Sequence, residues 1–352
     1  MSENPGKSEC MNQLLSSDED GQINAICAEI RQLLDKAVHR CITNQKMGIM
    51  LSGGLDASVI AALASKYTHL TAYTVALKGA YAPDIEASSI VTNTFGIRHR
   101  IHYIDEDQLQ ELMPPVIKIL KTFDPIELRN SIALYAGMLE AKEDGIEVLL
   151  TGDGSDELMV GYNFIIDMKK EALESRLRKM WSFMAFSAVP LAAALGITTK
   201  IPYLDPDFKA YAMSLDIKYK VRNRGCIIFG KWILRKAFEG ILPNEIAWRT
   251  KAPVQCGSGT ISLPEYFAAK ISDEDFAKKK EYYLKNDKVR VDTKEQLAYY
   301  EVFRVVNGVP RKPRFAASCP QCNSELSPLV DYCHTCGAGL KLSLQGSRYP
   351  TK

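Results

Sequence analysis

The feature that most restricts the fold of this chain is a glycine-rich loop that joins a short apolar run to a helix-forming segment. The run KMGIML, residues 46–51, is followed at once by SGGLDAS and then by the helix-forming SVIAALASKY. A strand–turn–helix order places the loop at a helix N-terminus, where exposed N–H groups and the helix dipole favour anions. Glycines let the backbone approach phosphate oxygens closely. The loop residues that we expect at a nucleotide are Ser52, Gly53, Gly54, Asp56 and Ser58.

Strands alternate with helices along the first half of the chain. The periodicity predicts strands at 46–51, 71–77, 99–104 and 147–151, and helices at 24–41, 85–94, 108–121 and 131–142. This alternation is typical of an α/β fold with a doubly wound parallel sheet, in which ligands bind beyond the carboxyl ends of the strands.

The region from 163 to 298 is predicted to be mostly helical. Its apolar stretch 181–195 is too short to span a bilayer and is predicted to be a buried helix. The first residues lack the basic and apolar segments of a secretory signal. We therefore expect a cytoplasmic protein that does not enter the membrane.

A second glycine-rich turn, TGDGSDELMVGY at 151–162, follows the predicted strand 147–151. It brings Asp153, Asp156 and Glu157 to the same edge of the sheet as the first loop. Carboxylates beside a phosphate loop would repel a nucleotide unless a cation were present, which indicates Mg²⁺. We expect Asp56 and Asp156 to share this ion. The first loop lacks the lysine of a Walker motif, which argues against simple transfer of the γ-phosphoryl group.

Four motifs occur in an order that we recognise: SGGLDAS, TGDGSDELMVGY, IPYLD at 201–205 and KWILRKAFEGILPNEIAWRTK at 231–251. On these motifs, residues 24–308 resemble the synthetase domain of asparagine synthetase, a PP-loop ATP pyrophosphatase. The resemblance implies an ATP-dependent ligase that converts a small-molecule carboxylate into an acyl-adenylate, releases pyrophosphate and transfers ammonia or an amine to the acyl group. It also implies that Leu51, Gly53, Val75, Thr151 and Gly152 line the ATP site and that Lys251 contacts the phosphates. A cation near the α-phosphate would stabilise both the attack and the leaving pyrophosphate.

The sequence departs from this family at three places. Residue 2 is Ser where glutamine-using members carry a nucleophilic cysteine, and the residues before the loop are too few for a glutaminase domain. We therefore expect free ammonia, a separate glutaminase or another nucleophile. Asp153 stands where the family has glutamate, and we expect it to handle the incoming amine as a base or a binding group. The segment 252–260, APVQCGSGT, differs from the family pattern.

The divergent segment leaves an alternative open, because it contains Cys256. This thiol is either a packing residue or a sulfur carrier in a PP-loop enzyme that adenylates tRNA or protein and takes sulfur from a donor. A non-catalytic nucleotide-binding scaffold is the third interpretation.

Two CxxC pairs near the C-terminus have the spacing of a zinc site. Their cysteines are Cys319, Cys322, Cys333 and Cys336. Four thiolates fill a tetrahedral Zn²⁺ site, so the ion is expected to be structural. We predict a flexible N-terminus at 1–23, a synthetase-like domain at 24–308, a linker at 309–316, a zinc ribbon at 317–342 and a tail at 343–352. The basic residues of the linker keep a tRNA partner open.

Overall fold

The computed structural model describes residues 17–314, 316–327 and 331–340. The predicted flexible N-terminus at 1–23 is corrected in part, because helix α1, Ser17–Cys41, already begins at residue 17. Residues 1–16 and the predicted tail at 343–352 lie outside the described residues.

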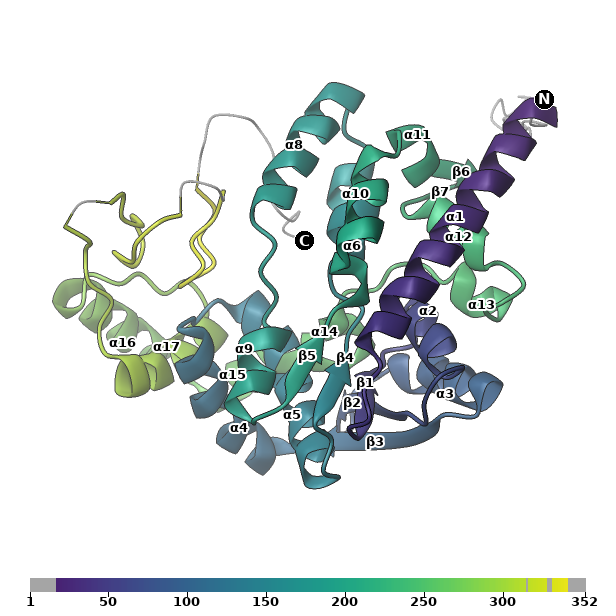
Figure 1. Cartoon of the computed structure of the whole chain (residues 1–352). Helices are drawn as coiled ribbons and strands as arrows, with labels where there is room; N and C mark the ends of the chain where they lie inside the picture. The colour runs from purple at the N-terminus through teal and green to yellow at the C-terminus, as the bar shows by residue number, and fades with distance from the viewer. Residues whose placement is uncertain (1–16, 315, 328–330, 341–352) are drawn as a thin grey trace, which may run out of the picture.

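A five-stranded parallel sheet forms the centre of the molecule (Figure 1), as the sequence predicted. Its order is β3-β2-β1-β4-β5, and its strands are β1 Met47–Met50, β2 Thr71–Leu77, β3 Arg98–Ile104, β4 Val148–Leu150 and β5 Thr198–Lys200. Strand β5 was not predicted, because TTK is short and polar and carries no apolar alternation. The strand order runs outward from β1 in both directions, so a topological switch point lies between β1 and β4.

Helices cover both faces of this sheet. One apolar cluster contains the inward sides of α1, α2 Leu55–Ala64, α3 Asp84–Phe95 and α12 Trp232–Phe238. The other contains those of α4 Glu106–Leu120, α5 Pro125–Glu143, α9 Ala188–Ala194, α15 Leu263–Lys270 and α17 Lys294–Asn307. In α2 every residue except Asp56 is buried, because this helix lies between the sheet and α1.

Further helices and one hairpin complete the region after β4. They are α6 Ser155–Met159, α7 Asn163–Ile166, α8 Lys170–Ser182, α10 Pro206–Ser214, α11 Ile217–Lys220, the hairpin of β6 Arg222–Arg224 and β7 Ile227–Phe229, α13 Asn244–Ala247, α14 Val254–Gly257 and α16 Asp273–Asn286.

The prediction of one buried helix at 181–195 is wrong. Helix α8 ends at Ser182, the chain is irregular up to Ser187, and α9 begins at Ala188. In a continuous helix the ring of Pro190 would clash with the carbonyl four residues earlier, and a start at Ala188 avoids this clash because it places Pro190 in the first turn of α9. No helix in the described part of the chain has the length and apolarity needed to cross a membrane.

The cysteine module packs against the rest of the chain. Its four cysteines lie in the same apolar cluster as Phe123 and Tyr300. The backbone N–H of Phe123 donates to the carbonyl of Thr335 at 2.7 Å, and Gln296 Nε2 donates to the carbonyl of Cys336 at 2.9 Å. The module is therefore held in a defined position on α17 and on the loop between α4 and α5.

Candidate active site

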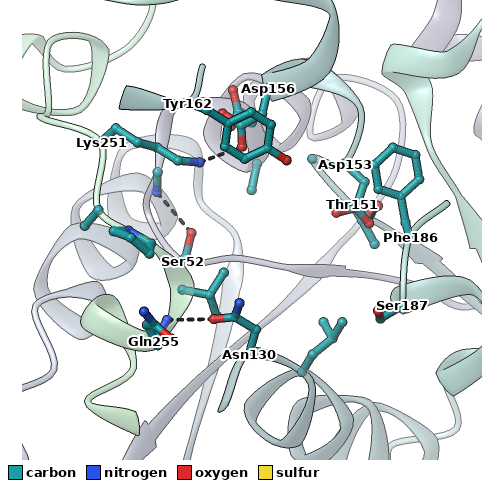
Figure 2. A pocket seen from close by; sticks show the side chains of 18 of the residues that line it. Ser52, Asn130, Thr151, Asp153, Asp156, Tyr162, Phe186, Ser187, Lys251 and Gln255 are labelled. Carbon is teal, nitrogen blue, oxygen red and sulfur yellow. Dashed lines mark hydrogen bonds and ion pairs between the residues drawn. The ribbon is translucent and has the colours of Figure 1, made fainter. Parts of the chain in front are cut away.

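A cavity of about 910 Å³ opens at the carboxyl ends of β1 and β4 (Figure 2). Ten of the predicted site residues line it: Leu51, Ser52, Gly54, Asp56, Val75, Thr151, Gly152, Asp153, Asp156 and Lys251. The two glycine-rich turns thus meet at the switch point of the sheet, where ligands bind in folds of this kind.

Gly53 and Ser58, also predicted site residues, shape the loop instead of lining the cavity. Gly53 has a left-handed φ of +66°, and a Cβ there would lie 2.4 Å from the carbonyl carbon of Ala87. The loop therefore rests directly on the backbone of α3. The hydroxyl of Ser58 is buried and donates to the carbonyl of Gly54 at 2.7 Å, which holds the first turn of α2.

Two aspartates and two lysines form a tight cluster on the cavity wall. Lys231 Nζ lies 2.5 Å from Asp56 Oδ2 and 2.5 Å from Asp156 Oδ1, and Lys251 Nζ lies 2.6 Å from Asp156 Oδ2. Burial alone would raise the pKa of Asp156, but the two ammonium groups outweigh it and hold this pKa well below its usual range. Burial opposes the charge of Lys251, yet Asp156 raises the pKa of Lys251 above its usual value. Both ions are therefore charged at neutral pH.

Sequence reasoning missed Lys231, which is 2% exposed. Its backbone has a left-handed φ of +56°, a conformation that costs a residue other than glycine about 1–3 kcal/mol. A Cβ on Gly161 would lie 1.9 Å from Asp156 Oδ1 and 2.1 Å from Lys231 Cε. Only glycine at 161 leaves room for this ion pair. Gly161 and Lys231 both stand in the recognised motifs, but contact between them depends on tertiary structure.

Two arginines, also missed, fix the segment that carries Lys251. Arg235 is 5% exposed and donates to the carbonyls of Ala247 at 2.8 Å and Arg249 at 2.9 Å. Arg249 in turn donates to the carbonyl of Ser52 and to Asp84 Oδ1, each at 3.0 Å. The phosphate loop, the start of α3 and the Lys251 segment are thereby tied together.

Asp153 has a different environment from Asp156. It accepts a hydrogen bond from Thr151 Oγ1 at 2.9 Å. Burial, followed by the charges of Asp156 and Asp56, raises its pKa to about 6 despite the Thr151 donor. A carboxyl group with such a pKa exchanges its proton near neutral pH, as a general base requires.

The motif IPYLD contacts the start of α2 and the second glycine-rich turn. The Tyr203 hydroxyl donates to the carbonyl of Asp56 at 3.2 Å, and Asp205 forms an ion pair with Arg40 at 2.7 Å. A Cβ on Gly154 would lie 2.9 Å from Leu204, so this motif packs closely under the second glycine-rich turn.

The aspartate pair fits the predicted Mg²⁺. Asp56 Oδ1 is buried and, among the residues that the structure describes, has no hydrogen-bond partner. One cation, the ammonium of Lys231, already lies between the two carboxylates. Carboxylate oxygens are the ligands that Mg²⁺ prefers. An ion held by Asp56 and Asp156 therefore agrees with the donors present and stays a prediction.

The four cysteines of the module fit the predicted Zn²⁺. All four are buried, and their sulfur atoms lie within 4.8 Å of one another. The pairs Cys319–Cys336 and Cys322–Cys333 are each 3.6 Å apart. A tetrahedral ion with Zn–S bonds of about 2.3 Å needs sulfur atoms roughly 3.8 Å apart. The zinc assignment also stays a prediction.

Cys256 lies outside the cavity lining, although its neighbour Gln255 is part of it. Burial raises the pKa of the Cys256 thiol. A sulfur carrier needs the thiolate, so neither observation favours the sulfur-transfer alternative.

Comparison with known proteins gives the family. A model of the asparagine synthase family matches residues 29–189 and 169–304. Asparagine synthetase B, named as glutamine-hydrolyzing, from Escherichia coli (strain K12) is 30% identical over 316 residues, covering 83% of this chain and 55% of that protein. A probable glutamine-hydrolyzing asparagine synthetase of Dictyostelium discoideum is 30% identical over 310 residues, covering 79% of this chain and 55% of that protein.

The chain thus spans about half the length of the curated relatives it matches. Among solved structures, NMN synthetase from Francisella tularensis has a TM-score of 0.38 and 12% identity, covering 83% of this chain and 99% of that one. The family match includes both glycine-rich turns and the segment that carries Lys231 and Lys251. On this match, the chain belongs to the asparagine synthase family.

Proposed function

We propose that this chain is an AMP-forming, ATP-dependent ligase that adenylates a carboxylate and transfers ammonia or an amine to it. One observation carries the proposal: the phosphate loop, the aspartate pair and Lys251 line a single cavity. The positively charged N-terminus of α2 and the Ser52–Gly54 turn are suited to the phosphates.

In the first stage, an oxygen of the acceptor carboxylate attacks the α-phosphorus of ATP, and the bond to pyrophosphate breaks. Lys251 stabilises the negative charge that develops on the phosphoryl oxygens. When bound by Asp56 and Asp156, Mg²⁺ supplies charge neutralisation for the phosphates. Lys231 pairs with both carboxylates and so holds Asp56 and Asp156 side by side.

In the second stage, the nitrogen of ammonia or an amine attacks the acyl carbon, and the bond from that carbon to AMP breaks. The nitrogen loses a proton as the amide forms. Asp153 accepts this proton, because its pKa of about 6 leaves it mostly deprotonated at neutral pH. Family members carry glutamate here, so the shorter Asp153 requires the nitrogen to sit closer to the loop.

The test is pyrophosphate release from ATP and Mg²⁺ with ammonium and either aspartate or other carboxylic acids. Asp56→Ala serves as the blank. We expect acid-dependent release, with one AMP formed for each pyrophosphate. ATP binding without release by any acid would contradict the proposal and favour a nucleotide-binding scaffold. Release that needs tRNA and is lost in Cys256→Ser would favour the sulfur-transfer alternative.

A further inference from the structure

The lining of the cavity divides into two sides of different chemistry. One side is lined mainly by neutral residues and comes from the ends of β1 and β2, from α14 and from α5, which also brings Glu127 to the lining. Its residues include Leu51, Val75, Asn130, Leu134, Gln255 and Ser258. Figure 2 shows Asn130 and Gln255 on this side and Asp153 and Phe186 on the other. The phosphate loop lies between them, so a nucleoside on the neutral side leaves the second side for the acceptor.

Two segments far apart in sequence form the second side. Helix α8 contributes Arg176, Lys179 and Met180, and the irregular segment after it contributes Phe183 and Phe186. The second CxxC pair, Cys333 and Cys336, with its flanking residues 331–337 is here called the second knuckle. It contributes Asp331, Tyr332 and His334 to the same lining. The cysteine module is therefore part of the active-site wall.

Direct contacts join the second knuckle to α8 across the cavity mouth. Arg176 Nη1 forms an ion pair with Asp331 Oδ2. The rings of Phe183 and His334 have centroids 5.5 Å apart, and those of Tyr332 and His334 are 4.5 Å apart. These distances are those of aromatic rings in contact. The second knuckle thus forms one continuous wall of the cavity with α8 and Phe183, and this wall is here called the roof.

The position of this roof is fixed by the body of the protein. Thr122 Oγ1 donates to the carbonyl of His334 at 2.7 Å. A Cβ on Gly337 would lie 2.5 Å from Asp124 Oδ1, so the knuckle rests closely on the start of α5. On the other side, Trp181 Nε1 donates to the carbonyl of Glu157, in the second glycine-rich turn, at 3.0 Å. Both halves of the roof are therefore anchored beside the phosphate site.

The roof carries aromatic side chains that remain accessible. Phe183 is 40% exposed, and Phe164, which also lines the cavity, is 44% exposed. Exposed apolar groups gathered at a cavity usually mark a ligand contact. Asp331 pairs with Arg176, so this wall offers a ligand its aromatic rings together with the cationic Lys179. An acceptor as small and polar as aspartate would leave these rings in water.

We propose that the acceptor is a carboxylic acid with an aromatic body and that the second knuckle, together with Phe183, selects it. This inference rests on the proposed adenylation. The carboxylate points to the phosphate loop, and the aromatic body lies against Phe183 and Tyr332. The zinc module then acts as a determinant of substrate specificity in addition to its structural role.

The experiment measures pyrophosphate release with ATP, Mg²⁺ and ammonium for phenylacetate, 4-hydroxyphenylacetate, indole-3-acetate, aspartate and glutamate. We expect kcat/KM for at least one aromatic acid to exceed that for aspartate by roughly tenfold or more. Phe183→Ala and Tyr332→Ala should each raise KM for that acid by roughly tenfold, with KM for ATP within about twofold of the native value. Bound zinc is measured in Tyr332→Ala, because Tyr332 precedes the cysteine ligand Cys333 in the chain. Phe183 lies outside the cysteine module.

Tyr282→Ala is the matched control, because Tyr282 is 52% exposed on α16 and does not line the cavity. It should leave both KM values unchanged. A preference for aspartate, with unchanged aspartate KM in Phe183→Ala, would overturn the inference and leave the proposed ligase intact. Release that requires added tRNA instead of any free acid would also overturn it. Release with none of the acids would overturn both proposals.

Discussion

Replacing Lys231 with methionine tests the central ion cluster. Lys231 pairs with both Asp56 and Asp156. In the variant, Asp156 still pairs with Lys251, whereas Asp56 loses its ion pair with Lys231. Removing one partner of a buried ion pair leaves an uncompensated charge, which typically costs 3–5 kcal/mol. Asp56 retains 18% side-chain exposure, so we expect a loss near the lower end, about 3 kcal/mol in the free energy of unfolding.

The assay is urea denaturation at pH 7 in EDTA and again in Mg²⁺. An ion that binds the native state stabilises it by mass action. Mg²⁺ should therefore recover more stability in Lys231→Met than in the native protein, because it replaces the lost positive charge. Lys236→Met is the control, since Lys236 pairs with Glu239 at 2.5 Å but is 41% exposed. Exposed pairs contribute about 0–1 kcal/mol.

The pH dependence of this variant has a defined sign. The folded-state pKa of Asp156 is depressed, so its stabilising contribution is present above the usual value of 3.8 and is lost as pH falls through the folded pKa. Lys231 causes part of that depression, so the difference in stability between native protein and variant should shrink below about pH 4. A loss under about 1 kcal/mol at pH 7, or no difference in the response to Mg²⁺, would refute this account of the cluster.

Three further substitutions test the site. Asp153→Asn should lower kcat by about 10²–10⁴ with little change in KM for ATP. In the native protein, the rate of amide formation should fall as pH drops through about 6, where Asp153 becomes protonated. A rate that stays constant from pH 5 to 8 would contradict the role of Asp153 as base. Lys251→Met should lower kcat by about 10²–10³, and single-turnover measurement of pyrophosphate release should show the loss in the first stage; an unchanged first stage would exclude Lys251 from it. Cys322→Ser should abolish zinc binding by metal analysis and raise KM for the acceptor, because the second knuckle loses its support; full zinc content in this variant would refute the four-cysteine assignment.

Much of the sheet could be predicted from sequence, because β1, β2 and β4 are buried apolar runs that end at turns. Glycine and acidic residues at those turns also indicated residues that line the cavity, since their chemistry is local. The break in the helix at 181–195 was missed, because apolar composition outweighed the signal of Pro190.

The remaining features depend on tertiary contacts. Lys231 contacts the aspartates because its backbone is left-handed and because Gly161 leaves space beside them. Neither feature produces a periodic pattern in the sequence. The spacing of the four cysteines predicts a metal site but carries no information on where the module docks. Its contact with α8 involves Arg176 and Asp331, which lie 155 positions apart in the chain.

The burial of α2 has a consequence for how ligands enter and leave. Moving this helix, and the phosphate loop at its start, would expose nine buried side chains, whereas α8 buries only Leu173 and Leu177. Regions with few buried contacts open at the lowest free energy. For the proposed reaction, we therefore expect the phosphate loop to keep its position and the ligands to pass by local opening of α8. Such an opening would separate Arg176 from Asp331.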